Sequence, residues 1–188
     1  MTRVTKCRHN ILSSRQKINR RLRPARHTNL GMLISIDPGN DTGWAIFRAG
    51  SLVDAGVGDP RTSTHHRLTS PEGQQQDTVD EVWIESQVCY PRSKVPPNDL
   101  IKLAQSAGRW AGRYDSLGVE AHFVEPARWK GQVPKEIHQQ RIVNGLTTFE
   151  RAILLRAEKS VFVGRRHNML DAIGIGLWAL AATNRRAT

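Results

Sequence analysis

The sequence has few cysteines and no long hydrophobic run, and both absences limit the kind of protein it encodes. Its two cysteines, Cys7 and Cys89, stand in no metal-ligand spacing and are too few for a disulfide framework. No stretch approaches the roughly 20 apolar residues of a membrane span, and there is no hydrophobic segment of the kind found in signal peptides. We therefore expect a soluble, cytoplasmic protein with reduced thiols and no membrane contact.

Acidic side chains are absent from the N-terminal segment, which is strongly basic. Residues 1–30 contain nine lysines and arginines and no Asp or Glu, so they carry +9 of the formal net charge of +11. Such a segment is usually disordered alone, and it suits a polyanion because binding releases the polyanion's counterions. We expect a disordered basic extension whose partner is nucleic acid. An organelle transit peptide is a weaker alternative, since the segment has only two serines and no periodic apolar face.

The rest of the chain suits one globular domain, because 188 residues are hardly enough for two. We expect this domain over residues 31–184. Apolar runs separated by short glycine-containing turns predict three strands in an antiparallel meander, at residues 32–37, 43–48 and 51–57. Polar residues dominate the segment 59–79, which we predict as mainly loop.

A strand, a helix and a further strand are predicted next. The strands are expected at residues 81–88 and 119–124, with a helix at 98–116 between them and Asn98 as its N-cap. This order predicts parallel strands joined by a right-handed crossover. The last third of the chain predicts three helices, at residues 134–144, 147–157 and 167–183. The fold class is therefore α/β, with a mixed central sheet flanked by helices.

Three acids interrupt elements that are otherwise apolar: Asp37 and Glu85 end predicted strands, and Asp171 lies in the last predicted helix. A buried carboxylate is normally paired, hydrogen-bonded or bound to a cation, because burying its charge alone is expensive. If the two strands are neighbours and the helix crosses their ends, the acids converge. A divalent cation with oxygen ligands would relieve their repulsion. The sequence therefore predicts an Mg²⁺ site.

Each acid also has a simpler interpretation. Asp37 precedes Pro-Gly and suits the first position of a type I turn. Glu85 can end its strand facing solvent. Asp171 can cap its helix or pair with Arg165 or Arg166, which lie shortly before it in the chain. Each of these alternatives accounts for one acid, whereas the metal site accounts for all three.

Five segments resemble, in order, the motifs of the RuvC-type Holliday-junction resolvases of the RNase H-like superfamily. The resemblance is to a divergent, phage-like member, for which the cytoplasm would be that of the host. It runs from about Met32 to Ala182 and departs from the family's pattern at 59–79, where the family usually has a longer helix. The five segments are LISIDPGNDTGWAIF, VWIESQV, LIKLAQSAGRWAG, VEPARWKGQVPK and LDAIGIGLWAL.

The resemblance implies an RNase H-like fold and a set of catalytic residues. Asp37, Glu85 and Asp171 fall at the positions that bind two Mg²⁺ ions, for which Mn²⁺ substitutes. The family has a further catalytic residue about one turn before the last Asp. His167 and Asn168 both lie there, on the same side of the helix as Asp171. We favour His167 as catalytic residue and metal ligand, with Asn168 as the alternative ligand or orienting group.

The resemblance also implies contacts with DNA. Lys130 and Lys135 fall near the family's lysines that approach the phosphates, and a solvated basic face is their simpler interpretation. Tyr90 and Trp129 are candidates to stack on an unpaired base, although packing is the commoner role of an aromatic residue. The candidate DNA contacts are completed by three further basic residues, Arg92, Lys94 and Arg128.

The implied activity is resolution of four-way (Holliday) and related branched DNA junctions by paired nicking, with water attacking the phosphodiester. A homodimer would present two active sites to the two-fold symmetric junction, and the helix within residues 98–112 is a candidate dimer face. No nucleotide cofactor is expected. Two alternatives stay open: a noncatalytic junction-binding or nucleic-acid-binding protein, and a nuclease of this fold with another substrate. An actin-like ATPase, which also has an Asp-Gly-Thr-Gly-type turn, normally needs two such domains.

Overall fold

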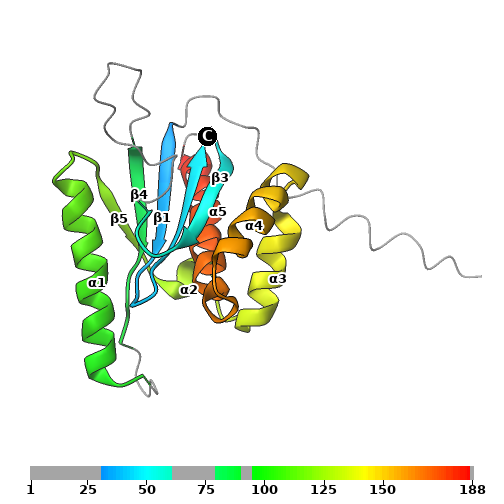
Figure 1. Cartoon of the computed structure of the whole chain (residues 1–188). Coiled ribbons are helices and arrows are strands. Elements are labelled where there is room, and N and C mark those ends of the chain that lie inside the picture. The colour runs from blue at the N-terminus through cyan, green and yellow to red at the C-terminus, as the bar shows by residue number, and fades with distance from the viewer. Residues whose placement is uncertain (1–30, 61–78, 90–94, 187–188) are drawn as a thin grey trace, which may run out of the picture.

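The computed structural model describes residues 31–60, 79–89 and 95–186. Five strands form one sheet in the order β3-β2-β1-β4-β5 (Figure 1). The strands are β1 (Met32–Asp37), β2 (Gly43–Arg48), β3 (Ser51–Val57), β4 (Val79–Glu85) and β5 (Ala121–Val124). The helices are α1 (Pro97–Asp115), α2 (Pro126–Trp129), α3 (Lys135–Gly145), α4 (Thr148–Ser160) and α5 (Arg166–Arg186), with a 3₁₀ turn η4 (Val163–Arg165) before α5.

The sheet is mixed. β1 pairs antiparallel with β2, and β2 pairs antiparallel with β3, which confirms the predicted meander. β1 pairs parallel with β4, and β4 pairs parallel with β5 on the far side of α1 in the chain. Ile36 lies opposite Ile84 in the parallel pair, so the next residue of each strand, Asp37 and Glu85, lies at the same edge of the sheet.

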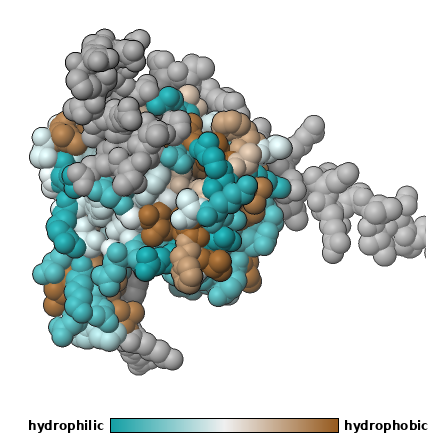
Figure 2. Space-filling view, viewed as in Figure 1, coloured by the Kyte–Doolittle hydropathy of each residue, from teal (hydrophilic) through white to brown (hydrophobic). Residues whose placement is uncertain are grey.

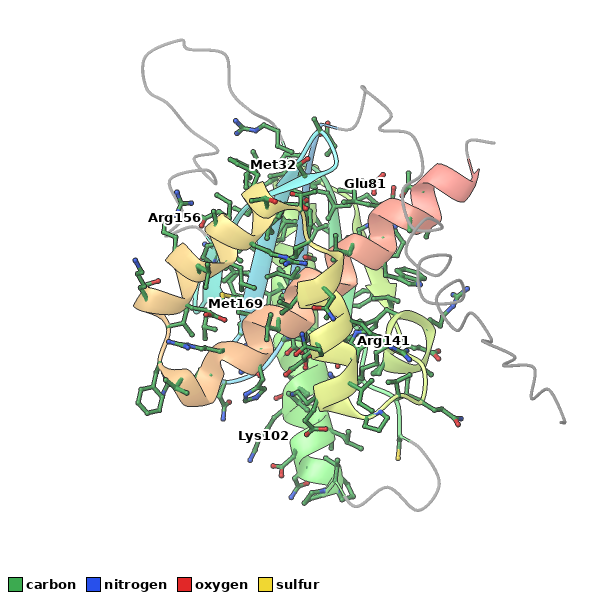
Figure 3. The ribbon with its side chains drawn as sticks, turned by 90° about the vertical axis from the view of Figure 1, so that its right-hand side faces the viewer. Met32, Glu81, Lys102, Arg141, Arg156 and Met169 are labelled. Atoms are coloured by element: carbon green, nitrogen blue, oxygen red, sulfur yellow. The ribbon has the colours of Figure 1, made fainter. Side chains whose placement is uncertain are left out.

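Helices cover both faces of the sheet. α1 lies on one face, whereas α3, α4 and α5 lie on the other (Figures 1 and 3). Residues alternate between the faces along β1: Ile34 and Ile36 pack in the core cluster beneath α1, and Leu33 packs in the cluster beneath α5. Asp37 and Glu85 continue the α5-facing rows of their strands. The alternation therefore directs both acids toward α5.

Small residues let α5 lie close to the sheet. A Cβ on Gly43 would overlap the backbone carbonyl of Asn168, and a Cβ on Gly176 would overlap the ring of Phe47. Buried Ser35 on β1 donates a hydrogen bond from its hydroxyl to the carbonyl oxygen of Ala172, at 2.7 Å. These contacts place the N-terminal half of α5 against β1 and β2.

Several boundaries differ from those predicted. The N-cap of α1 is Pro96 and not Asn98, because Pro97 occupies the first helical turn, where its missing N–H costs nothing and its fixed φ suits a helix. β4 begins two residues earlier than expected and ends at Glu85. The short helix α2 is not anticipated by the sequence patterns. The predicted loop 59–79 lies almost entirely outside the described residues, as does the basic extension.

Among the described residues, no helix combines the length and the apolar character that crossing a membrane requires.

We predict that Gly43→Ala destabilises the protein by about 1–3 kcal/mol, because the added methyl forces α5 away from β2. Urea unfolding followed by circular dichroism measures this cost. Gly145→Ala is the matched control, since a Cβ at this last residue of α3 meets no neighbouring atom. Equal stability of the Gly43 and Gly145 variants would contradict the close contact between α5 and β2.

Candidate functional site

The three acids singled out from the sequence come together at one edge of the sheet. Asp37 ends β1, Glu85 ends β4, and Asp171 lies in the second turn of α5. Glu85 and Asp171 are only 6% and 5% exposed, and Asp37 is partly buried. Glu85 therefore does not face solvent at its strand end. The simpler interpretation of that residue is wrong.

The electrostatics of Asp37 show how the acids interact. Burial raises the pKa of the Asp37 carboxyl well above its ordinary value, and the negative charges of Glu85 and Asp171 raise it further. The cations Lys130 and Lys135 act in the opposite direction and are not sufficient to reverse the shift. The three carboxylates thus lie close enough for the charges of Glu85 and Asp171 to act on Asp37.

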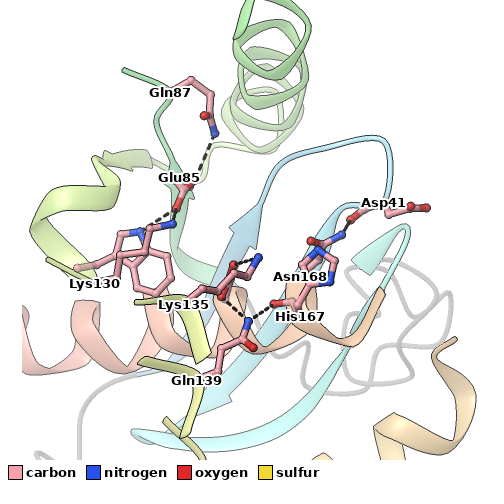
Figure 4. Close-up of polar contacts among 10 residues, drawn as sticks. Asp41, Glu85, Gln87, Lys130, Lys135, Gln139, His167 and Asn168 are labelled. Carbon is pink, nitrogen blue, oxygen red and sulfur yellow. Dashed lines mark hydrogen bonds and ion pairs between the residues drawn. The ribbon is translucent and has the colours of Figure 1, made fainter. Parts of the chain in front are cut away.

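Glu85 is held by three neighbouring side chains (Figure 4). The buried indole N–H of Trp129 donates to Glu85 Oε2 at 2.9 Å, and Lys130 Nζ lies 3.5 Å from the same oxygen. Gln87 donates from its amide to Oε1 at 3.3 Å. Lys130 also lies over the Trp129 ring, 4.9 Å from its centroid. Trp129 of α2 and the residue after it, Lys130, thereby orient the Glu85 carboxylate. Glu85 lies 45 residues before Lys130 in the chain.

Asp171 is held by the first turns of α3 (Figure 4). Lys135 Nζ lies 3.0 Å from Oδ2, and the amide of Gln139 donates to Oδ1 at 3.0 Å. Gln139 also donates to the backbone oxygen of His167 at 3.4 Å. Asp171 does not pair with the arginines just before it, because Arg165 pairs with Asp41 and Arg166 with Glu158. The predicted alternative of a local ion pair is wrong.

His167 and Asn168 both lie in the first turn of α5, but only one has a side-chain contact with the turn after Asp37. Asn168 donates from its amide to the backbone oxygen of Asp41 at 2.7 Å, and Arg165 pairs with the Asp41 carboxylate at 3.1 Å. His167 is exposed. Asn168 therefore anchors the β1–β2 turn to α5.

The predicted DNA contacts fall into three groups. Lys130 and Lys135 lie against the acids, as described above, and Arg128 is exposed on α2. Trp129 is only 6% exposed and hydrogen-bonded to Glu85, so its ring is not open to an unpaired base and the packing interpretation applies. Tyr90, Arg92 and Lys94 lie outside the described residues.

The donor set fits a hard divalent cation by its chemistry. Asp37, Glu85 and Asp171 offer carboxylate oxygens in a largely buried cluster, where burial and the two neighbouring charges raise the pKa of Asp37. Among the described residues, no three His, Cys, Asp or Glu side chains stand in the arrangement of a ready-made metal site. Two of the three acids instead have a lysine ammonium as their counter-charge.

Sequence patterns miss two residues beside the acids. Gln139 lies four positions after Lys135 on α3, and this spacing places both on one side of the helix. This spacing is the sequence signal that associates Gln139 with Lys135. His138 packs edge-on to Trp129, with ring centroids 5.0 Å apart, and burial lowers the pKa of its imidazole. No sequence signal distinguishes it.

Comparison with solved structures identifies the fold. Thermus thermophilus RuvC in complex with a Holliday junction substrate superimposes with a TM-score of 0.50, at 18% sequence identity, over 82% of this chain and 96% of that chain. The chain has the RuvC fold. A second Thermus thermophilus RuvC structure matches with a TM-score of 0.39, also at 18% identity, over 84% of this chain and 97% of that chain.

The resemblance to RuvC-type resolvases is thus confirmed for the fold, as is the expected α/β RNase H-like architecture. No protein-family model matches the sequence, and neither does any curated protein.

We predict that Asp37→Asn stabilises the metal-free protein by on the order of 1 kcal/mol at pH 7.5. The folded-state pKa of Asp37 is raised, so its favourable contribution is fully present below the unfolded pKa and is lost as pH rises through the folded pKa. The wild type should therefore lose stability from acidic to neutral pH relative to the variant.

Urea unfolding in EDTA at several pH values measures this difference. Asp115→Asn, at an exposed position of α1, is the control and should change stability by less than about 0.5 kcal/mol. An Asp37→Asn protein that is less stable than the wild type at pH 7.5 would show that its carboxylate is not under electrostatic strain.

Proposed function

We propose that this protein is a metal-dependent endodeoxyribonuclease that resolves four-way (Holliday) and related branched DNA junctions by paired nicks. The observation that carries the proposal is the convergence of Asp37, Glu85 and Asp171 from three separate elements at one edge of a RuvC fold. The similar RuvC structure contains a Holliday junction substrate. The strongly basic composition also favours a polyanionic partner.

The three carboxylates would hold two Mg²⁺ ions, with Mn²⁺ able to replace them. When bound, such ions lower the pKa of a coordinated water and neutralise charge on the leaving oxygen. Trp129 and Gln139 orient two of the carboxylates by direct hydrogen bonds. Both acids are thereby held in place before any cation arrives.

Lys130 and Lys135 have a double role in this proposal. In the structure they balance the charge of Glu85 and Asp171. Both ammonium groups keep part of their surface exposed, so they can turn to the phosphate of a bound strand and stabilise the negative charge that grows on it. Arg128, Tyr90, Arg92 and Lys94 are the further proposed DNA contacts.

His167 and Asn168 have different proposed roles. His167 is exposed one turn before Asp171, where its imidazole can accept a proton from the attacking water or ligate a cation. Asn168 keeps the turn after Asp37 in place through its bond to Asp41. It is the orienting group of the pair.

The proposed assembly is a homodimer of residues 31–184, with residues 1–30 adding phosphate contacts. α1 offers an exposed strip of apolar and small residues on the side away from the sheet: Ile101, Ala104, Gly108 and Gly112. A second α1 helix can approach such a strip closely, since its small side chains leave room. Two active sites would then face the two strands that are nicked.

One observation favours a second candidate function. The lysine–carboxylate pairs satisfy two of the acids without any cation, as a structural site would. The protein would then bind junctions without cutting them.

We predict that the protein introduces paired, symmetric nicks into a four-way junction in Mg²⁺ and leaves a linear duplex of the same arms uncut. Asp37→Asn should bind the junction normally and cut at least about a hundredfold more slowly, because one ligand shared by the proposed ions is lost. Denaturing gels of end-labelled DNA measure both products.

Three other results of the cleavage experiment would each support a different conclusion. Junction binding without nicks would support the noncatalytic alternative. Equal cutting of both substrates would indicate a nuclease of this fold with a broader substrate range. Cutting by Asp37→Asn at the wild-type rate would show that the acid cluster is not the active site.

We predict that deletion of residues 1–30 weakens junction binding and flattens its dependence on salt, because each lost phosphate contact reduces the slope of log K against log salt by about 0.9. Fluorescence anisotropy over a series of salt concentrations measures the slope. An unchanged slope would show that the basic extension does not touch DNA.

A further inference from the structure

A groove lies between α1 and the turn that follows Asp37, on the α1 side of the sheet. Two adjoining cavities of about 740 and 340 Å³ share four lining residues, so they form one continuous groove. We call it the α1 groove. The shared residues are Gly39, Asn40, Ser106 and Arg109.

One wall of the α1 groove is the turn that immediately follows Asp37. Gly39 and Asn40 from this turn line both cavities. Two hydrogen bonds hold this turn in place. The Thr42 hydroxyl donates to the Gly39 carbonyl at 2.9 Å, and it accepts a hydrogen bond from the indole N–H of Trp110 at 3.3 Å. The groove therefore has a fixed wall that begins two residues from a proposed metal ligand.

The other wall is a basic flank of α1. Lys102, Arg109 and Arg113 line the groove and are separated by seven and four residues, a spacing that places them on one side of the helix. Figure 3 labels Lys102 on the N-terminal half of α1, and Figure 2 shows that much of the exposed surface of this helix is hydrophilic. The three basic residues are not part of the strip proposed for the dimer, although one residue of that strip, Gly108, also lines the groove.

The arginines of this flank are available for an anionic ligand. Arg109 is exposed and makes no hydrogen bond or ion pair with another described residue. Arg113 is half-buried and lines the groove, and its guanidinium carbon lies over the Trp110 ring, 5.9 Å from the ring centroid.

Two carboxylates also line the groove, and both are already engaged. Asp99 pairs with Lys102 at 3.3 Å, in an exposed contact that a phosphate can replace at little cost. Asp59 has an interaction of its own within the protein. The central part of the groove, at Arg109, is therefore positive.

The length of the basic flank matches a DNA backbone. A helix rises 1.5 Å per residue, so the Cα atoms of Lys102 and Arg113 are about 16 Å apart along α1. Phosphates along one strand of a duplex advance about 3.4 Å per nucleotide. Measured along the duplex axis, the flank thus spans roughly five nucleotides of one strand, so phosphates of that strand can reach both of its ends.

We propose that the α1 groove holds the sugar–phosphate backbone of one DNA arm as that strand passes the acid cluster. Arg109 and Arg113 contact its phosphates, and the braced turn at Gly39 and Asn40 is the opposite wall. This assignment rests on the proposed junction-resolving function and adds to it a binding surface on the face of the sheet opposite α5.

The test is binding of a four-way junction in Ca²⁺, measured by anisotropy over a series of salt concentrations. Arg109→Ala/Arg113→Ala should weaken binding at least about tenfold near 0.1 M salt and lower the salt slope by about two, as expected for two lost phosphate contacts. Arg109→Glu alone should weaken binding as well. Because Arg109 is exposed and unpaired among the described residues, this variant keeps the fold intact.

Arg151→Ala/Lys159→Ala is the matched control, since it removes the same charge from exposed positions of α4 on the other side of the sheet. It should leave the salt slope within about 0.5 of the wild type. If the wild type cuts junctions and both groove variants keep its salt slope, the α1 groove does not bind DNA, and the proposed function is unaffected. A wild-type protein that neither binds nor cuts junctions would overturn the proposed function itself.

Discussion

Like charges placed together at the edge of a sheet determine how the rest of this molecule is built. Asp37, Glu85 and Asp171 lie together with little exposure to water, and burial, followed by the charges of Glu85 and Asp171, raises the pKa of Asp37. The protein offsets the cost of these charges with the ammonium groups of Lys130, just after α2, and of Lys135 on α3, and with hydrogen bonds from Trp129 and Gln139. Elements distant in the chain are thus tied to the ends of β1 and β4.

The position of α5 connects packing to this electrostatic arrangement. Gly43 permits the first turn of α5 to touch β2, and Ser35 binds the carbonyl of Ala172 next to Asp171. Asn168 then fastens the turn after Asp37 to the same helix. Because these contacts fix the position of both α5 and the turn after Asp37, small changes in core packing are expected to shift the three acids. The turn also forms a wall of the α1 groove, which couples the two proposed DNA-contacting regions.

Local patterns were sufficient to predict most of the sheet and the three acids, because strand alternation and an isolated carboxylate in an apolar run are visible along the chain. They failed where the deciding contact is distant in sequence or set by one backbone restriction. The buried partner of Glu85, Trp129, lies on α2, a helix too short to show periodicity. Trp129 carried no signal that it would be buried, and Pro97 rather than Asn98 determined where α1 starts.

The central claim is that the three acids form one cation site, and the unfolding free energy as a function of Mg²⁺ concentration tests it most directly. A ligand that binds only the folded state at a hundred times its Kd adds about 2.7 kcal/mol of stability. We expect the wild type to gain stability in this way and Asp37→Asn to lose nearly all of the gain. An equal gain in both proteins, or none in the wild type, would contradict the claim.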